Sequence, residues 1–90
     1  MVVKIDKSFK KDTNKILDQK LLIRVADSIL NTRKASDPSQ ITKIKKLKGS
    51  THHYRIKIGD YRLGIIISGS GVEFIRCLHR RDIYKFFPKK

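Results

Sequence analysis

The sequence predicts an α+β fold: an N-terminal strand, a two-helix hairpin, a three-stranded antiparallel meander and a short C-terminal helical segment. Two observations support this prediction. Apolar residues recur at helical spacing in the first half of the chain and alternate with polar residues in the second half. Turns rich in glycine, serine and aspartate divide the alternating half into segments of strand length. Helices followed by consecutive strands are typical of α+β domains.

The first half begins with a short β-branched segment, and Val2 to Ile5 is expected to form the first strand. A first helix is expected from Ser8 to about Asp18, and a second from about Gln19 to Lys34. Neither glycine nor proline separates these helices. Residues 35–39 are expected to form a loop, because they contain a proline without a backbone donor and an aspartate that favours turns.

The second helix is expected to bury one apolar stripe against the sheet. The residues of this stripe are Leu22, Val25, Ala26, Ile29 and Leu30. Arg24, Asp27 and Asn31 are expected to face away from it. The two helices would then cover one face of the sheet and leave the other face open.

The meander is predicted from three alternating segments. They are Tyr54–Ile58, Tyr61–Ile67 and Val72–Leu78, separated by Gly59-Asp60 and by 68–71. Residues 80–87 are expected to form one or two helical turns that end before Pro88.

A two-residue turn at Gly59-Asp60 specifies the pairing of the first hairpin. Ile58, Ile56 and Tyr54 would share an apolar face with Tyr61, Leu63 and Ile65. The other face would place Lys57 opposite Arg62 and Arg55 opposite Gly64. Like charges directly opposite are destabilising, and a glycine lets another backbone approach closely. The pattern therefore favours an anion site, although long basic side chains can also extend into water.

The same register, continued through the second turn, places Arg62 opposite Cys77 and Asp60 near His79. It also places Arg76 on the apolar face, so either a β-bulge shifts the last strand or Arg76 lies at a sheet edge. Cys77 is the single cysteine, which excludes a disulfide scaffold. It is expected to be a small buried hydrophobe and not a catalytic thiol.

The composition points to an anionic partner. The chain has 90 residues, expected to form one domain (1–90), with 22 basic and 8 acidic residues and a net charge of +14. Residues 41–90 carry 13 of the basic residues and only 3 acidic ones. Nucleic acid would relieve this repulsion through phosphate contacts and counterion release, whereas the alternative is a basic surface kept for solubility. No apolar run or leader is visible, so we expect a cytoplasmic protein without membrane contact.

The side chains available for catalysis are cations, a phenol and an imidazole. We find no metal-ligand spacing, no Gly-rich phosphate loop, no nucleophile-elbow serine and no paired carboxylates, so neither metal nor cofactor is expected. His52 and His53 are expected to be loop residues and not ligands. RNA cleavage fits this inventory, because the ribose 2′-OH supplies the nucleophile. The protein must then supply a base, an acid and cations for the charge on phosphorus. A lysine close to other cations can serve as base, whereas arginine keeps its proton.

Four segments together resemble the RelE branch of the RelE/ParE toxin superfamily. They are Lys46-Leu47-Lys48-Gly49, Tyr54–Ile58, Gly59–Leu63 and Leu78–Tyr84, and the ending Tyr84–Pro88 is similar to RelE-like members. The resemblance covers nearly the whole chain. It implies a toxin of a type II toxin–antitoxin pair that cleaves mRNA in the ribosomal A site.

Site residues follow from this resemblance by position. Arg55 and Lys57 match the two lysines of the family's basic strand, and Lys57 is the expected base because Arg55 keeps its proton. Arg62 matches an arginine that contacts the scissile phosphate. Arg80 matches the arginine after the last strand, and Tyr84 matches a tyrosine that stacks on the substrate base or aids proton transfer.

Other positions have less defined roles. His79 is typical of relatives that use histidine in catalysis, and Arg81 is the alternative to Arg80 in the phosphate role. Contacts to ribosomal or messenger RNA are expected from Lys43, Lys45, Lys46, Lys48 and Arg81.

The resemblance also implies a cognate RelB-like antitoxin that neutralises the basic face. Operator DNA would be bound only through the toxin–antitoxin complex. Two other functions remain open: a ParE-like inhibitor of DNA gyrase, and a non-catalytic nucleic-acid-binding module that uses the stretch from Lys43 to Lys57.

Overall fold

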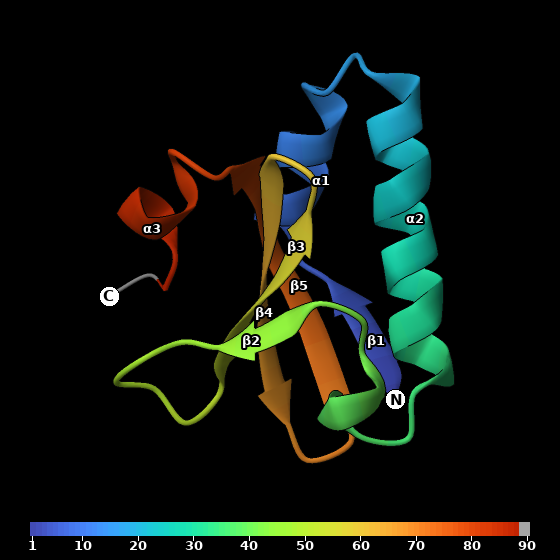
Figure 1. The fold of residues 1–90 in the computed structure, drawn as a ribbon, viewed down its shortest axis with the longest axis vertical. Helices are drawn as coiled ribbons and strands as arrows, with labels where there is room; N and C mark the ends of the chain where they lie inside the picture. The colour runs from blue at the N-terminus through green and yellow to red at the C-terminus, as the bar shows by residue number, and fades with distance from the viewer. Residues whose placement is uncertain (89–90) are drawn as a thin grey trace.

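The computed structural model describes residues 1–88, which form a five-stranded sheet with helices on both sides (Figure 1). The elements in chain order are β1 (Val2–Ile5), α1 (Lys7–Asn14), α2 (Gln19–Lys34), a 3₁₀ turn (Pro38–Gln40), β2 (Ile44–Lys46), β3 (His53–Ile58), β4 (Tyr61–Ser68), β5 (Gly71–His79) and α3 (Ile83–Phe86). The strand order is β1-β5-β4-β3-β2, in which only β1 and β5 are parallel. The predicted α+β class and order of elements are confirmed.

The helix boundaries are determined by aspartate caps. Asp18 begins α2, because its Oδ1 accepts hydrogen bonds from the backbone N–H groups of Lys20 (3.0 Å) and Leu21 (3.2 Å). The predicted range of α2 is therefore correct. The prediction for α1 is four residues too long at its C-terminal end, because the chain leaves the helix after Asn14 to reach the Asp18 cap. Leu17 lies in this connection and is 90% exposed.

One strand was not predicted. β2 has only three residues, and two of them are exposed lysines, so neither its length nor its composition indicates a strand. It forms because Ile44 pairs with Ile56 and Lys46 with Tyr54, at the edge of the β3–β4 hairpin. The strand is thus a product of tertiary pairing.

The predicted buried stripe of α2 is wrong by part of a turn. Val25 is buried and Ile29 is partly buried against the core, as expected, but the other buried positions are Ser28 and Thr32, whereas Ala26 and Leu30 are exposed. Apolar side chains occur on two sides of α2, so periodicity alone does not identify the side that faces the sheet. Thr32 can be buried because its Oγ1 donates to the Ser28 carbonyl at 2.9 Å.

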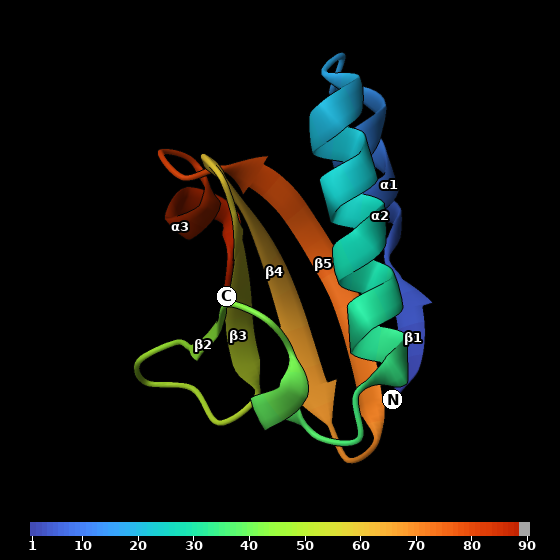
Figure 2. The same ribbon diagram turned by 45° about the vertical axis from the view of Figure 1, so that its right-hand side comes forward.

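The two faces of the sheet are covered differently. α1 and α2 lie on one side and enclose the core, which includes Phe9, Ile56, Leu63 and Phe74 (Figure 2). The opposite face was expected to be open. It is instead partly covered by α3 and the residue after it, Phe87, which is 1% exposed.

The β3–β4 register is confirmed: Ile58 pairs with Tyr61, Lys57 with Arg62, and Arg55 with Gly64. The register expected between β4 and β5 is confirmed from Ile65 to Ser68, but it is off by one residue from Tyr61 to Gly64, where Arg62 pairs with Leu78 and not with Cys77.

A bulge between β4 and β5 resolves the position of Arg76. Gly64 pairs with Arg76 and Ile65 with Phe74, so Ile75 is the extra residue. The bulge turns Arg76 away from the apolar face, where the uninterrupted register had placed it. Both predicted explanations hold, because β1 pairs with β5 only as far as Phe74 and Arg76 therefore also lies at an edge of the sheet.

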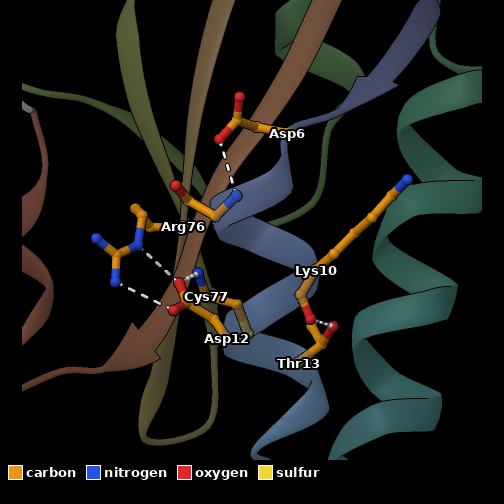
Figure 3. Close-up of polar contacts among 7 residues, drawn as sticks. Asp6, Lys10, Asp12, Thr13, Arg76 and Cys77 are labelled. Carbon is orange, nitrogen blue, oxygen red and sulfur yellow. Dashed lines mark hydrogen bonds and ion pairs between the residues drawn. The ribbon is translucent and has the colours of Figure 1, made fainter.

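Asp12 of α1 completes the edge of β5 beyond the end of β1 (Figure 3). Its carboxylate accepts from the Cys77 backbone N–H at 2.9 Å and from the Arg76 guanidinium at 2.8 and 3.1 Å. These hydrogen bonds raise the pKa of Arg76 above its ordinary value. The Asp12 side chain thus supplies the hydrogen-bond acceptor that a neighbouring strand would otherwise provide for the Cys77 N–H.

We expect Asp12→Asn to lower the free energy of unfolding by about 2–3 kcal/mol, because the change weakens a charged hydrogen-bond pair whose carboxylate is buried. Asp82→Asn is the matched control, since Asp82 pairs with Lys85 at 3.6 Å on the surface. Asp82→Asn should lower the free energy of unfolding by less than about 0.5 kcal/mol. Urea denaturation measures both values, and equal losses would contradict a buried role for Asp12.

Candidate nucleic-acid interface

Three cations project from the sheet face that α1 and α2 leave uncovered. Arg55 and Lys57 alternate with the buried Ile56 on β3, and Arg62 lies directly opposite Lys57 on β4. Strand alternation therefore places all three on one face. Lys45 of β2 pairs with Arg55 and extends this row to the sheet edge.

Backbone carbonyls orient the two arginines. One Arg62 nitrogen, Nη1, donates to the carbonyls of Gly59 (2.9 Å) and Tyr61 (3.0 Å), which fixes the guanidinium at the hairpin turn. Arg55 Nη1 donates to the Lys43 carbonyl at 3.0 Å. Within residues 1–88, no carboxylate lies within 4 Å of the charged groups of Arg55, Lys57 or Arg62. Their charges are therefore available to an external anion.

The C-terminal segment carries further polar groups, and its helix α3 lies on the same side of the sheet as these cations (Figure 2). Tyr84 lies on α3 and is 58% exposed, so its phenol is accessible. Arg80 and Arg81 lie in the turn between β5 and α3, and both are exposed. Arg80 forms a loose surface pair with Asp60 at 3.9 Å, and its backbone N–H donates to the Asp60 carbonyl.

His79 is separated from these cations by the sheet. It pairs with Tyr61, and their rings make an edge contact with centroids 5.6 Å apart. Because Tyr61 alternates with Arg62, this pair faces the side opposite to Lys57 and Arg62. The His79 ring accepts from the Arg81 backbone N–H at 3.1 Å, so it is tied to the turn that follows β5.

The four lysines expected to contact RNA do not lie on one face of the protein. All are exposed, but Lys45 shares the face of Arg55, whereas Lys46 pairs with Tyr54 and points to the other side. Lys48 lies in the loop between β2 and β3. Lys43 has a positive φ of 61°, an uncommon conformation for a residue with a Cβ.

Gly64 has a different role from the one expected. The hairpin pattern predicts that another backbone can approach the sheet closely at this glycine, as part of an anion site. It is buried, and a Cβ at this position would lie 2.7 Å from the Phe87 ring. The glycine therefore makes room for Phe87 of the same chain, and the approach to this point is closed. No sequence pattern links positions 64 and 87.

The histidine pair has structural contacts. His52 Nδ1 lies 3.1 Å from the Ile67 carbonyl, and His53 contacts both the Ser50 hydroxyl and the Phe87 ring. His53 belongs to β3 and not to a loop, which corrects the expectation for that residue. Across residues 1–88, no three His, Cys, Asp or Glu side chains are grouped as a metal site. No helix in that range is long and apolar enough to cross a membrane.

Cys77 gives a prediction for the pH dependence of stability. Burial raises the pKa of its thiol to about 12, and the Asp12 carboxylate adds to this effect. An unfolded thiol titrates near 8.5, so between these values the unfolded state loses a proton that the native state keeps. Stability is therefore lost as pH rises. We expect the free energy of unfolding to fall by about 1–2 kcal/mol more in the native chain than in Cys77→Ala between about pH 8 and 10. Parallel pH curves for the two proteins would contradict this.

Comparison with known proteins identifies related toxins. Residues 3–84 match the family described as the ParE toxin of type II toxin–antitoxin system, parDE. A 45-residue stretch, 50% of the chain, is 51% identical to Toxin RelE3 of Methanocaldococcus jannaschii and spans about half (51%) of that relative's length.

Solved structures extend this similarity to the whole fold. A chain of the RelB-RelE antitoxin–toxin complex from Methanococcus jannaschii superposes with a TM-score of 0.80 at 33% identity, over 94% of this chain and 99% of that chain. A chain of the RelBE2 complex from Mycobacterium tuberculosis shares the fold with a TM-score of 0.71 at 20% identity, over 88% and 96% of the two chains.

Proposed function

The chain belongs to the RelE/ParE family of toxins from type II toxin–antitoxin systems, and on that premise we propose that it is an endoribonuclease that cleaves mRNA in the ribosomal A site. One observation carries the proposal. Arg55, Lys57 and Arg62 share a sheet face, and no carboxylate of residues 1–88 pairs with them. Cations arranged in this way suit the charge that develops on a phosphate during cleavage. Such a role places the protein in the cytoplasm, with ribosomes and mRNA.

The proposed reaction uses the RNA's own nucleophile and needs no metal ion or cofactor from the protein. The ribose 2′ oxygen attacks the adjacent phosphorus while Lys57 accepts the 2′ proton. The bond between phosphorus and the 5′ oxygen breaks, which leaves a 2′,3′-cyclic phosphate and a 5′ hydroxyl. Arg62 and Arg55 stabilise the charge on the phosphoryl oxygens, because arginine stays protonated and presents several donors.

Residues after β5 complete the proposed site. Tyr84 stacks on the substrate base or donates the proton to the leaving 5′ oxygen, for which its exposed phenol is suited. Arg80 is the proposed phosphate contact of the turn, with Arg81 as the alternative. His79 would need to reach around the end of the sheet to take part, since it is paired with Tyr61 on the other face. We therefore assign the proton transfers to Lys57 and Tyr84.

The proposed regulator is a RelB-like antitoxin. Several structures that share this fold are toxin–antitoxin complexes, among them RelB-RelE and DinJ-YafQ. An antitoxin that covers the basic face would both neutralise its charge and block RNA. Operator DNA would then be bound through the complex and not by this chain alone.

Primer extension on an mRNA under translation in a cell-free extract tests the nuclease function. We expect cuts within codons when ribosomes are present, and none on the same RNA without ribosomes. Intact message in both samples would refute the proposal. A ParE-like inhibition of DNA gyrase is the second candidate, because the matching family carries the ParE name. A supercoiling assay with purified gyrase tests that function, and salt-dependent RNA binding without products would indicate a non-catalytic module.

A further inference from the structure

A cleft of about 310 Å³ lies between α2 and the edge of β3, and one of its lining residues, Lys57, also takes part in the proposed chemistry. The residues that line it include Arg24, Asp27, Lys43 and Lys57. Three of these are cations and one is a carboxylate. Arg24 and Asp27 were expected to point away from the helix stripe, and sequence periodicity could not show that the strand edge lies beside them.

The positive charge in this cleft has no internal partner. Within residues 1–88, no carboxylate lies within 4 Å of Arg24, Lys43 or Lys57, although Asp27 lines the same cleft. Neutral donors are also present. Asn31 uses its carbonyl oxygen to accept from the Thr42 N–H at 3.1 Å, which leaves its amide NH₂ group to donate. The lining therefore offers several donors and little negative charge, which suits an anion.

The cleft is joined to the basic face through Lys57. β2 pairs with β3 only at Tyr54–Ile56, so Lys57 and Ile58 extend beyond the end of β2. The positive φ of Lys43 turns its carbonyl toward β3, where it accepts from the Lys57 backbone N–H (3.2 Å) and from Arg55 Nη1 (3.0 Å). This linkage holds the two cationic regions side by side.

We propose that this cleft binds a phosphate group of the RNA, separate from the phosphate that is cleaved. The inference rests on the proposed RNA-cleaving function. An RNA strand that places its scissile bond beside Lys57 and Arg62 would pass the end of β3 at Lys57 and Ile58, and its next phosphates would lie within reach of Arg24. Backbone contacts of this kind position a nucleic acid without reading its sequence.

Fluorescence anisotropy with a labelled ten-nucleotide single-stranded RNA tests this site on the isolated chain. Arg24→Gln should weaken binding about 5- to 10-fold and reduce the slope of log K against log salt by about 0.7–1. Asp27→Asn should strengthen binding about 2-fold, because it removes the carboxylate from the cleft. Lys20→Gln, on the same helix but outside the cleft, is the matched control and should change binding by less than about 2-fold.

Three other binding results would overturn the phosphate site in this cleft. Equal weakening by Arg24→Gln and Lys20→Gln would overturn the proposal, because it would indicate a loss of overall charge. A weaker complex with Asp27→Asn would also overturn it. If a glutamate-rich peptide, but not the RNA, shifts the amide NMR signals that line the cleft, the site binds acidic protein segments instead.

Two further comparisons separate this site from the nuclease proposal and identify the source of the phosphate. Loss of binding in Arg24→Gln, with no cleavage on ribosomes by the native chain, would support the cleft and refute the nuclease. If the native chain cleaves mRNA on ribosomes and Arg24→Gln binds RNA as tightly as the native chain, the nuclease proposal is supported and the phosphate site in the cleft is refuted. A photo-crosslinker attached to Asp27→Cys then distinguishes mRNA from ribosomal RNA, since the native Cys77 is buried and will not be labelled.

Discussion

Arg62→Ala is expected to reduce mRNA cleavage on ribosomes by about 10²–10³-fold while the protein stays folded. Arg62 Nη1 is held by the Gly59 and Tyr61 carbonyls, so the remaining guanidinium donors are oriented beside Lys57. Alanine removes a positioned charge that would act in the transition state. The single-turnover cleavage rate on programmed ribosomes measures this effect, and circular dichroism verifies the fold.

Two other variants show whether the geometry of Arg62 matters or only its charge. Arg62→Lys keeps the charge but loses the planar fork of donors, so it should recover only part of the rate. Arg33→Ala removes an exposed arginine from the last turn of α2 and should leave the rate unchanged. A folded Arg62→Ala protein with native activity would remove Arg62 from the proposed site.

Phe87→Ala is expected to lower the free energy of unfolding by about 3–5 kcal/mol, because Phe87 is 1% exposed and its ring fills the space over Gly64. Cleavage should also decrease, since the same ring anchors the segment that carries Tyr84. Phe86→Ala is the control. Phe86 is 50% exposed, and the guanidinium carbon of Arg76 lies 5.2 Å from the centroid of its ring. Removing this ring should lower the free energy of unfolding by about 1 kcal/mol or less. Denaturant unfolding of both variants tests the difference, and similar losses would contradict the packing described here.

The complementary variant is Gly64→Ala. Its new Cβ would lie 2.7 Å from the Phe87 ring, so we expect a loss of about 1–3 kcal/mol from overpacking. Shortening the ring in Gly64→Ala/Phe87→Leu should make the combined loss smaller than the sum of the single losses by at least about 0.5 kcal/mol. Additive losses would show that the two positions do not share one packing site.

Much of the candidate site could be predicted because it lies on a local hairpin. A two-residue turn specifies which residues face each other, so the pairing of Lys57 with Arg62 and of Arg55 with Gly64 follows from the order of residues. The proposed role of Tyr84 rests on the family resemblance alone, because the position of α3 depends on the path of the chain after β5.

The other part of the site depends on contacts between distant segments. The cleft beside Arg24 exists because α2 packs against a strand edge that is distant from it in sequence, and helical periodicity does not indicate which side of α2 meets that edge. The need for glycine at position 64 likewise depends on Phe87, whose ring packs there from the C-terminal segment. The bulge at Ile75 is a third case, since Asp12 of α1 supplies the partner for the shifted β5 edge.

Local sequence alone thus specified the α+β order, the range of α2 and the face of each residue in the β3–β4 hairpin. These features depend on backbone geometry and on neighbours within a few positions, which the chain order states directly. Tertiary packing specified β2, the buried side of α2, the bulge in β5 and the closure of the sheet over Gly64. Each of these depends on which remote surface supplies a hydrogen-bond partner or fills a space, and that choice is made only when the whole chain is packed.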